Sequence, residues 1–254
     1  MSSSPLGDSA KLERSLGLAR ASLSRISTNG YIKSACLSFS ATVFIAWQYA
    51  LRDERTLLAD ATIWQSIDRR LPQGALDRVR RFLDKNFYLR PGDERQRPWA
   101  LVTSAFSHIS FGHFVANALS FNAFSELLMI FLPPVHFCGV ILASALAGSA
   151  AFLVQQSRKK FPNRRIRALG MSAVTSGMGA MAAYLFPQAP ASIYGIKMPM
   201  WAAFAGYFAW DAFFLESERS TTGHAAHLGG ALAGLIYGAC LTASGVIRTR
   251  RFRS

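Results

Sequence analysis

Five ionisable or strongly polar side chains lie within or at the mouths of long apolar tracts. They are His113, Asn117, Ser172, His224 and His227. A serine hydroxyl becomes a nucleophile when a base such as histidine lies beside it. Histidine and asparagine can also donate hydrogen bonds to an oxygen that gains negative charge during acyl transfer. These residue types therefore fit a nucleophile, a base and oxyanion donors, provided that the fold brings them together.

The spacing of small residues around two of these side chains predicts such a meeting. One series comprises Ser172, Ser176, Gly179 and Ala183, and the other comprises His227, Ala231, Gly234 and Gly238. Each series falls at i, i+4, i+7 and i+11, which is one face of a helix, and faces of small residues let membrane helices pack closely. If the two faces meet, the first members of both series come within hydrogen-bonding reach. Taken singly, Ser172 reads better as a serine at a helix start, and His227 can be a packed polar residue; the pairing of the two series favours the dyad.

Two further polar residues share one helix face. His113 and Asn117 are four residues apart, so both project from the same side of a helix. Such a pair can aim two hydrogen bonds at one point, as an oxyanion requires. The backbone amide of Ser172, close to the start of its helix, would supply a third donor.

Apolar tracts of membrane length must position these residues. Of 254 residues 51% are hydrophobic, and four stretches carry almost no charge: 34–51, 98–157 with Glu126 alone, 168–196 and 220–247. A spanning helix needs about 20 apolar residues, so the sequence predicts an all-α, polytopic membrane protein. The pair Pro133-Pro134 divides the second tract, and Pro187, Pro190 and Pro199 bracket the connection to a further span. The six predicted spans are 35–51, 99–131, 135–155, 170–186, 200–215 and 224–246.

The long connection at 52–98 contains a helical pattern. Leu76, Val79, Phe82, Leu83 and Phe87 recur at helical spacing among basic residues. This pattern predicts an amphipathic helix in the headgroup region, with a solvated loop as the alternative. The count of basic residues on the two sides does not fix the orientation of the chain.

The net charge of +14 could indicate either nucleic acid or lipid as a partner. The bases lie between the apolar tracts, so we predict contacts with anionic headgroups and no nucleic acid. Residues 1–34 are basic and rich in serine, which fits a targeting segment or a cytosolic tail before a membrane domain at 35–247 and a basic tail at 248–254. The three cysteines lie within apolar tracts, so no disulfide or zinc framework is expected.

Three motifs in one order resemble the rhomboid family. "WALVTSAFSHISFGHFVANAL" (Trp99 to Leu119) looks like its second-helix motif, "LGMSAVTSG" (Leu169 to Gly177) its serine motif, and "GHAAHLGGALAG" (Gly223 to Gly234) its final-helix histidine motif. The last is similar to the mitochondrial presenilin-associated rhomboid-like branch.

The resemblance implies a six-helix rhomboid core that cleaves transmembrane segments of single-span proteins. It assigns Ser172 as nucleophile, His227 as base, and His113 with Asn117 as the oxyanion hole. It implies a serine–histidine dyad without an aspartate, no cofactor and no metal. From the resemblance we expect a multi-pass protein located in the mitochondrial inner membrane.

Other interpretations stay open. Ala173 stands where the family usually has glycine, and Ser176 stands where many members have a larger residue. A rhomboid-fold pseudoprotease that binds membrane clients is the first alternative, and Ser176 as nucleophile is another. A metal site or transporter using His108 and His113 with His224 and His227 is disfavoured, because we expect no acid beside these residues. His224 is expected to have a supporting or solvated role, and His108 and His136 to lie at the interface.

Overall fold

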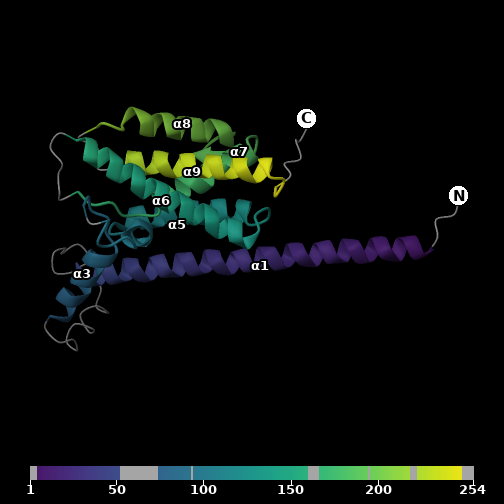
Figure 1. Ribbon diagram of the computed structural model, residues 1–254, viewed down its shortest axis with the longest axis horizontal. Helices are drawn as coiled ribbons and strands as arrows, with labels where there is room; N and C mark the ends of the chain where they lie inside the picture. The colour runs from purple at the N-terminus through teal and green to yellow at the C-terminus, as the bar shows by residue number, and fades with distance from the viewer. Residues whose placement is uncertain are drawn as a thin grey trace.

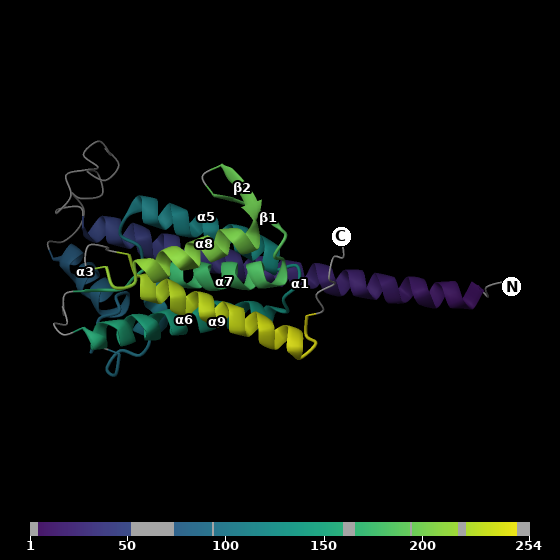
Figure 2. The same ribbon diagram turned by 90° about the horizontal axis from the view of Figure 1, so that it is seen from above.

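The chain folds into a bundle of helices around one central helix (Figures 1 and 2). The computed structural model describes residues 5–51, 74–92, 94–159, 166–193, 195–217 and 222–247. Within these residues, six helices have 14 residues or more: α1 (Pro5–Ala50), α5 (Phe111–Leu128), α6 (Pro134–Arg158), α7 (Ser172–Leu185), α8 (Met200–Phe213) and α9 (His224–Ala243). The predicted C-terminal tail and much of the connection at 52–98, namely 52–73, lie outside the described residues.

Helix α1 includes the first predicted span and continues toward the N-terminus through most of the segment predicted as a tail. Its N-terminal part extends beyond the other helices in both views (Figures 1 and 2). The Asn29 amide nitrogen donates to the carbonyls of Met129 and Leu132, at 3.1 and 2.8 Å, and Lys33 pairs with Glu126. Since the carbonyls at a helix end lack partners within the helix, Asn29 fixes α1 to the chain just after α5.

The prediction of one helix over 99–131 is wrong. The segment forms α4 (Ala100–Thr103), a 3₁₀ turn η3 (Ser104–Phe106) and then α5, and Ser107 between them has an extended backbone. Polar partners on α1 hold the break in place. The Trp47 indole donates to the Ser107 hydroxyl at 2.8 Å, and Ser40 Oγ lies 3.2 Å from His108 Nδ1.

The amphipathic segment in the first connection is confirmed as a helix, α3 (Ala75–Asn86). Leu83 is buried and packs in a cluster with Val43 and Trp47 of α1. The neighbouring Phe82 side chain is not among the buried residues of this cluster and is 59% exposed. Its placement among lipid headgroups stays a prediction.

Helix α7 is the centre of the bundle. It packs against α5, α6, α8 and α9, and nearly all its residues are buried. A helix that is apolar all round needs such an environment, and "SAVTSGMGAMAAYL" supplies small side chains that let four neighbours approach. A short antiparallel hairpin, β1 (Pro190–Ile193) with β2 (Ile196–Pro199), connects α7 to α8.

Within the described residues, α6 and α9 are the two helices that are long and apolar enough to cross a membrane by length and composition. Helices α7 and α8 have 14 residues each, about 21 Å at the usual rise, which is shorter than a bilayer core of about 30 Å. Six spanning helices therefore stay a prediction.

Candidate active site

The start of α7 is held by three neighbouring segments. Leu89 and Ala168 exchange two backbone hydrogen bonds, of 3.1 and 2.9 Å, and the Gly170 amide donates to the Ser104 carbonyl at 2.9 Å. The Met171 amide donates to His108 Nε2 at 3.2 Å. His108 is 1% exposed, and its expected depth at the membrane interface stays a prediction. These contacts fix the backbone immediately before the first helical residue of α7, which is Ser172.

Gly170 lets the His113 ring lie against this backbone. Its φ is +114°, in the region that favours glycine, and a Cβ atom here would lie 2.6 Å from His113 Cε1. A side chain at this position would therefore displace the ring as well as strain the turn. His113 thus lies beside the segment leading to Ser172, and its role as an oxyanion donor stays a prediction.

The predicted contact between α7 and the last helix is confirmed. A Cβ atom on Gly230 would overlap the carbonyl oxygen of Ala173, and one on Gly234 would overlap that of Gly177. The two backbones therefore touch over one full turn. Of the touching residues, Gly234 belongs to a predicted face, whereas Gly230, Ala173 and Gly177 lie beside the predicted faces.

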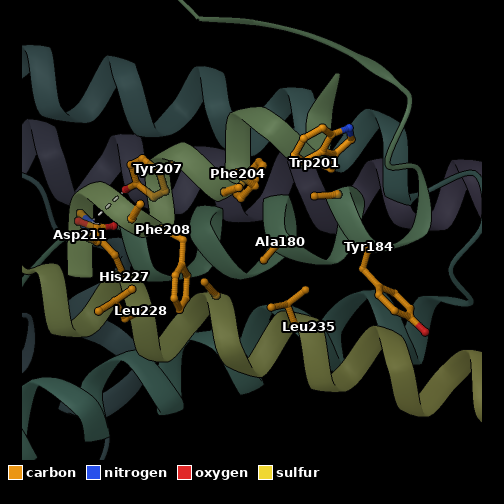
Figure 3. Close-up of a pocket in the computed structure, with 14 residues that line it drawn as sticks. Ala180, Tyr184, Trp201, Phe204, Tyr207, Phe208, Asp211, His227, Leu228 and Leu235 are labelled. Atoms are coloured by element: carbon orange, nitrogen blue, oxygen red, sulfur yellow. Dashed lines mark hydrogen bonds and ion pairs between the residues drawn. The ribbon is translucent and has the colours of Figure 1, made fainter. Parts of the chain in front are cut away.

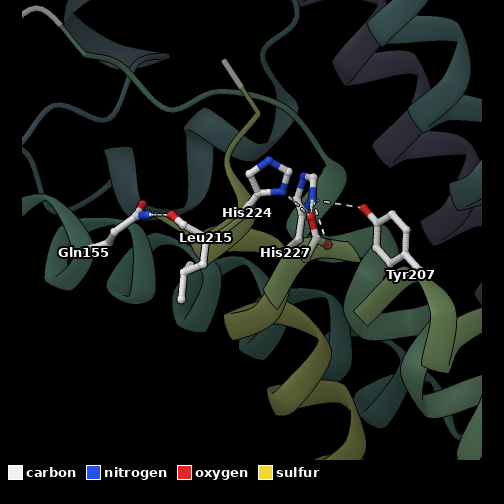
Figure 4. Close-up of polar contacts among 6 residues, drawn as sticks. Gln155, Tyr207, Leu215, His224 and His227 are labelled. Carbon is white, nitrogen blue, oxygen red and sulfur yellow. Dashed lines mark hydrogen bonds and ion pairs between the residues drawn. The ribbon is translucent and has the colours of Figure 1, made fainter. Parts of the chain in front are cut away.

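His227 lies in a buried polar cluster that includes an acid from α8. Its Nδ1 is 3.2 Å from both carboxylate oxygens of Asp211 and 3.0 Å from the Tyr207 hydroxyl, and His224 Nδ1 is 2.6 Å from Asp211 Oδ1 (Figure 4). Asp211, His224 and His227 are 2%, 5% and 8% exposed. The expectation that no acid lies beside these histidines is therefore wrong.

The signal for Asp211 was present in the sequence. It is one of the few charged residues in an apolar tract, and such a residue is expensive in a membrane unless it has partners or a function. The separation of 16 residues from His227, across the connection between α8 and α9, concealed the contact.

Ser172 and Ser176 differ in their surroundings. Ser172 is half-buried, and within the described part of the chain its hydroxyl makes no hydrogen bond, to His227 or to another residue. Ser176 lies one turn deeper and is 3% exposed, and its hydroxyl, near Tyr207, has no partner with hydrogen-bonding geometry among the described residues. The serine–histidine dyad stays a prediction.

The two oxyanion candidates have different neighbours. The His113 ring lies 5.1 Å from that of His108 between centroids and within electrostatic range of His227. The Asn117 amide nitrogen donates to the His113 carbonyl at 2.8 Å, within its own helix. The same nitrogen carries a second hydrogen, and donation of that hydrogen to a substrate oxygen stays a prediction.

A mainly apolar cavity of about 430 Å³ ends at the histidine cluster. Helices α7, α8 and α9 line it, with Tyr207, Asp211 and His227 at one end and Trp201 with Tyr184 toward the other (Figure 3). A cavity that is apolar along most of its length and polar at one end suits a mostly apolar ligand whose polar group lies at that end.

Comparison with known proteins gives a consistent match. The family model described as "Rhomboid domain" matches residues 95–244, which is more than half of the chain. "Rhomboid protein 1, mitochondrial" of Saccharomyces cerevisiae is 32% identical over 162 residues, covering 62% of this chain and 46% of that protein. "RHOMBOID-like protein 12, mitochondrial" of Arabidopsis thaliana is 28% identical over 166 residues, covering 60% and 47%. The chain thus spans less than half the length of these curated relatives.

Proposed function

The chain belongs to the rhomboid family, and from this membership we propose that it is an intramembrane serine endopeptidase acting on single-span membrane proteins. It is a mitochondrial integral membrane protein, consistent with both relatives. We assign it to the inner membrane, in contact with anionic headgroups. Ser172 is the nucleophile and His227 the base. The observation that carries the proposal is the contact between α7 and α9, which places the two helices that bear these residues backbone to backbone.

Asp211 gives the base its tautomer. A carboxylate accepts hydrogen bonds and cannot donate them, so the proton of a neutral His227 lies on Nδ1, which faces Asp211. The Tyr207 oxygen shares the same N–H. Nε2 is then free to take the proton from the Ser172 hydroxyl, and the imidazolium that forms is stabilised by the carboxylate. The expected dyad thereby becomes a nucleophile, a base and a positioning residue.

The reaction proceeds through an acyl-enzyme. Ser172 Oγ attacks the scissile carbonyl as His227 takes its proton, and His227 then returns the proton to the leaving amine. His113 and the Ser172 amide donate to the negatively charged oxygen, and Asn117 joins them through the second hydrogen of its amide nitrogen. A water molecule, activated by the same base, hydrolyses the ester. The cavity between α8 and α9 holds the apolar part of the substrate near the base.

Cleavage by the purified protein tests this function. The chain is reconstituted in liposomes that contain anionic lipid, together with mitochondrial single-span proteins labelled at both ends. We expect paired fragments cut within or beside the transmembrane segment, and none with Ser172→Ala. Binding of these proteins without cleavage would contradict a protease and favour the rhomboid-fold pseudoprotease.

Replacing Asp211 by asparagine tests its positioning role. The same change in the triad aspartate of a soluble serine protease lowers kcat about 10⁴-fold through the wrong tautomer. For Asp211→Asn we expect kcat to fall by at least about 10²-fold, with KM little changed, because the substrate does not need this carboxylate for binding.

The matched control is Asp84→Asn, since Asp84 lies on α3 and its partners are Arg90 and Arg167 rather than a histidine. It keeps kcat within about twofold, as expected for a partly exposed ion pair. Thermal unfolding of both variants separates loss of fold from loss of chemistry. An Asp211→Asn protein that unfolds normally and keeps its full kcat would remove Asp211 from the mechanism.

A further inference from the structure

We infer that Asp211, His224 and His227 form a binding site for a zinc ion, and that zinc held there inhibits the enzyme. The inhibition rests on the proposed function, whereas the binding does not. Each residue offers one ligand atom, and the three atoms all lie within 4.8 Å of one another. Both histidines lie in the first turn of α9 and present Nδ1 to the carboxylate of Asp211, which lies near the end of α8 (Figure 4).

The donor set suits zinc, and its ligand atoms, which lie within 4.8 Å of one another, need side-chain shifts to reach the spacing of a zinc site. Imidazole nitrogen and carboxylate oxygen bind Zn²⁺ at about 2.0–2.2 Å, so ligand atoms of a tetrahedral site lie about 3.3 Å apart. His227 Nδ1 already lies 3.2 Å from both oxygens of Asp211. His224 Nδ1, at 2.6 Å, must move away from Oδ1 by several tenths of an ångström. The Tyr207 hydroxyl lies 3.0 Å from His227 Nδ1, so a further oxygen donor is close to the cluster.

The charge of the cluster also favours a cation. Asp211 is 2% exposed, and among the described residues its side-chain partners are the two histidines, with no lysine or arginine. A buried carboxylate is stabilised by a positive charge, and a divalent ion is a large one. Asp211 and His227 both line the cavity between α8 and α9.

Zinc at this position would remove the base. A neutral imidazole binds a metal through a nitrogen that carries no proton, so zinc on Nδ1 leaves the His227 proton on Nε2. Nε2 is the atom that must accept the Ser172 proton. The metal and the acylation step therefore compete for the same imidazole, and the site acts as an off-switch set by the zinc concentration.

Binding is measured first, on a protein that cannot cleave. Ser172→Ala protein in detergent, freed of metal with a chelator, is titrated with ZnCl₂ in a calorimeter. We expect one ion per chain, and a Kd raised at least tenfold when His224→Gln is added. The control His136→Gln, which changes a histidine bonded to Tyr237, leaves the Kd unchanged. Mg²⁺, which prefers oxygen ligands, is expected not to bind.

Inhibition is measured next, on the chain with Ser172 intact. Zinc is expected to stop cleavage and EDTA to restore it. The zinc concentration that halves the cleavage rate is expected to be at least tenfold higher for His224→Gln, with each variant compared with its own rate in the absence of zinc. Zinc binding to the Ser172→Ala protein without cleavage by the intact chain would overturn the proposed function and leave the site standing. The zinc site would be overturned if the unmodified chain is active but Ser172→Ala protein binds no zinc. It would also be overturned if adding His224→Gln to Ser172→Ala leaves the Kd for zinc unchanged.

Discussion

Gly234→Ala is expected to force α7 and α9 apart and to abolish cleavage. A Cβ atom on Gly234 would overlap the Gly177 carbonyl oxygen and lie 2.5 Å from its carbonyl carbon. Both atoms belong to a helix backbone, so no side-chain rotation can relieve the contact. Overpacking of this kind typically costs about 1–3 kcal/mol, and we expect the upper end because two helices must move. Separation of these helices also carries His227 away from Ser172.

The matched change is Gly206→Ala on α8, where nothing lies within 4 Å of the added Cβ. Alanine is favoured over glycine within a helix by about 1 kcal/mol, so this variant is expected to be as stable as the unmodified protein or slightly more stable. Thermal unfolding in detergent and cleavage in liposomes are measured for both. A Gly234→Ala protein with unchanged unfolding temperature and rate would refute the close contact as the basis of the site.

The sequence predicted those elements whose apolar patterns are local. The prediction of 135–155 corresponds to α6 (Pro134–Arg158), and 224–246 corresponds to α9 (His224–Ala243), because a proline pair and a glycine mark their beginnings. It failed at 99–131, where an apolar tract contains a break. The break depends on Trp47 and Ser40, which are more than 50 residues away and offer no local signal.

The site was predictable to the extent that it depends on helical faces. The small-residue faces correctly brought α7 against α9, and His113 lies beside the backbone leading to Ser172. Asp211 was missed as a partner of His227, since an acid on α8 can face many sides of the bundle. Only the packing of α8 against α9 decides which side it faces.

The identity of the nucleophile is the central claim, and two serines on α7 compete for it. Ser172 begins the helix and is half-buried, so a substrate carbonyl and a water molecule can approach it. Ser176 is 3% exposed and lies one turn deeper. One turn beyond His227 on α9 stands Ala231, which cannot accept a proton, so a deeper serine has no base of its own.

A serine-reactive fluorophosphonate distinguishes the two directly. The detergent-solubilised protein, Ser172→Ala and Ser176→Ala are labelled side by side, and thermal unfolding shows that each is folded. The expected result is labelling of the unmodified chain and of Ser176→Ala, and none of Ser172→Ala. Labelling that survives in Ser172→Ala and disappears in Ser176→Ala, or a folded unmodified chain that never reacts, would contradict Ser172 as the nucleophile.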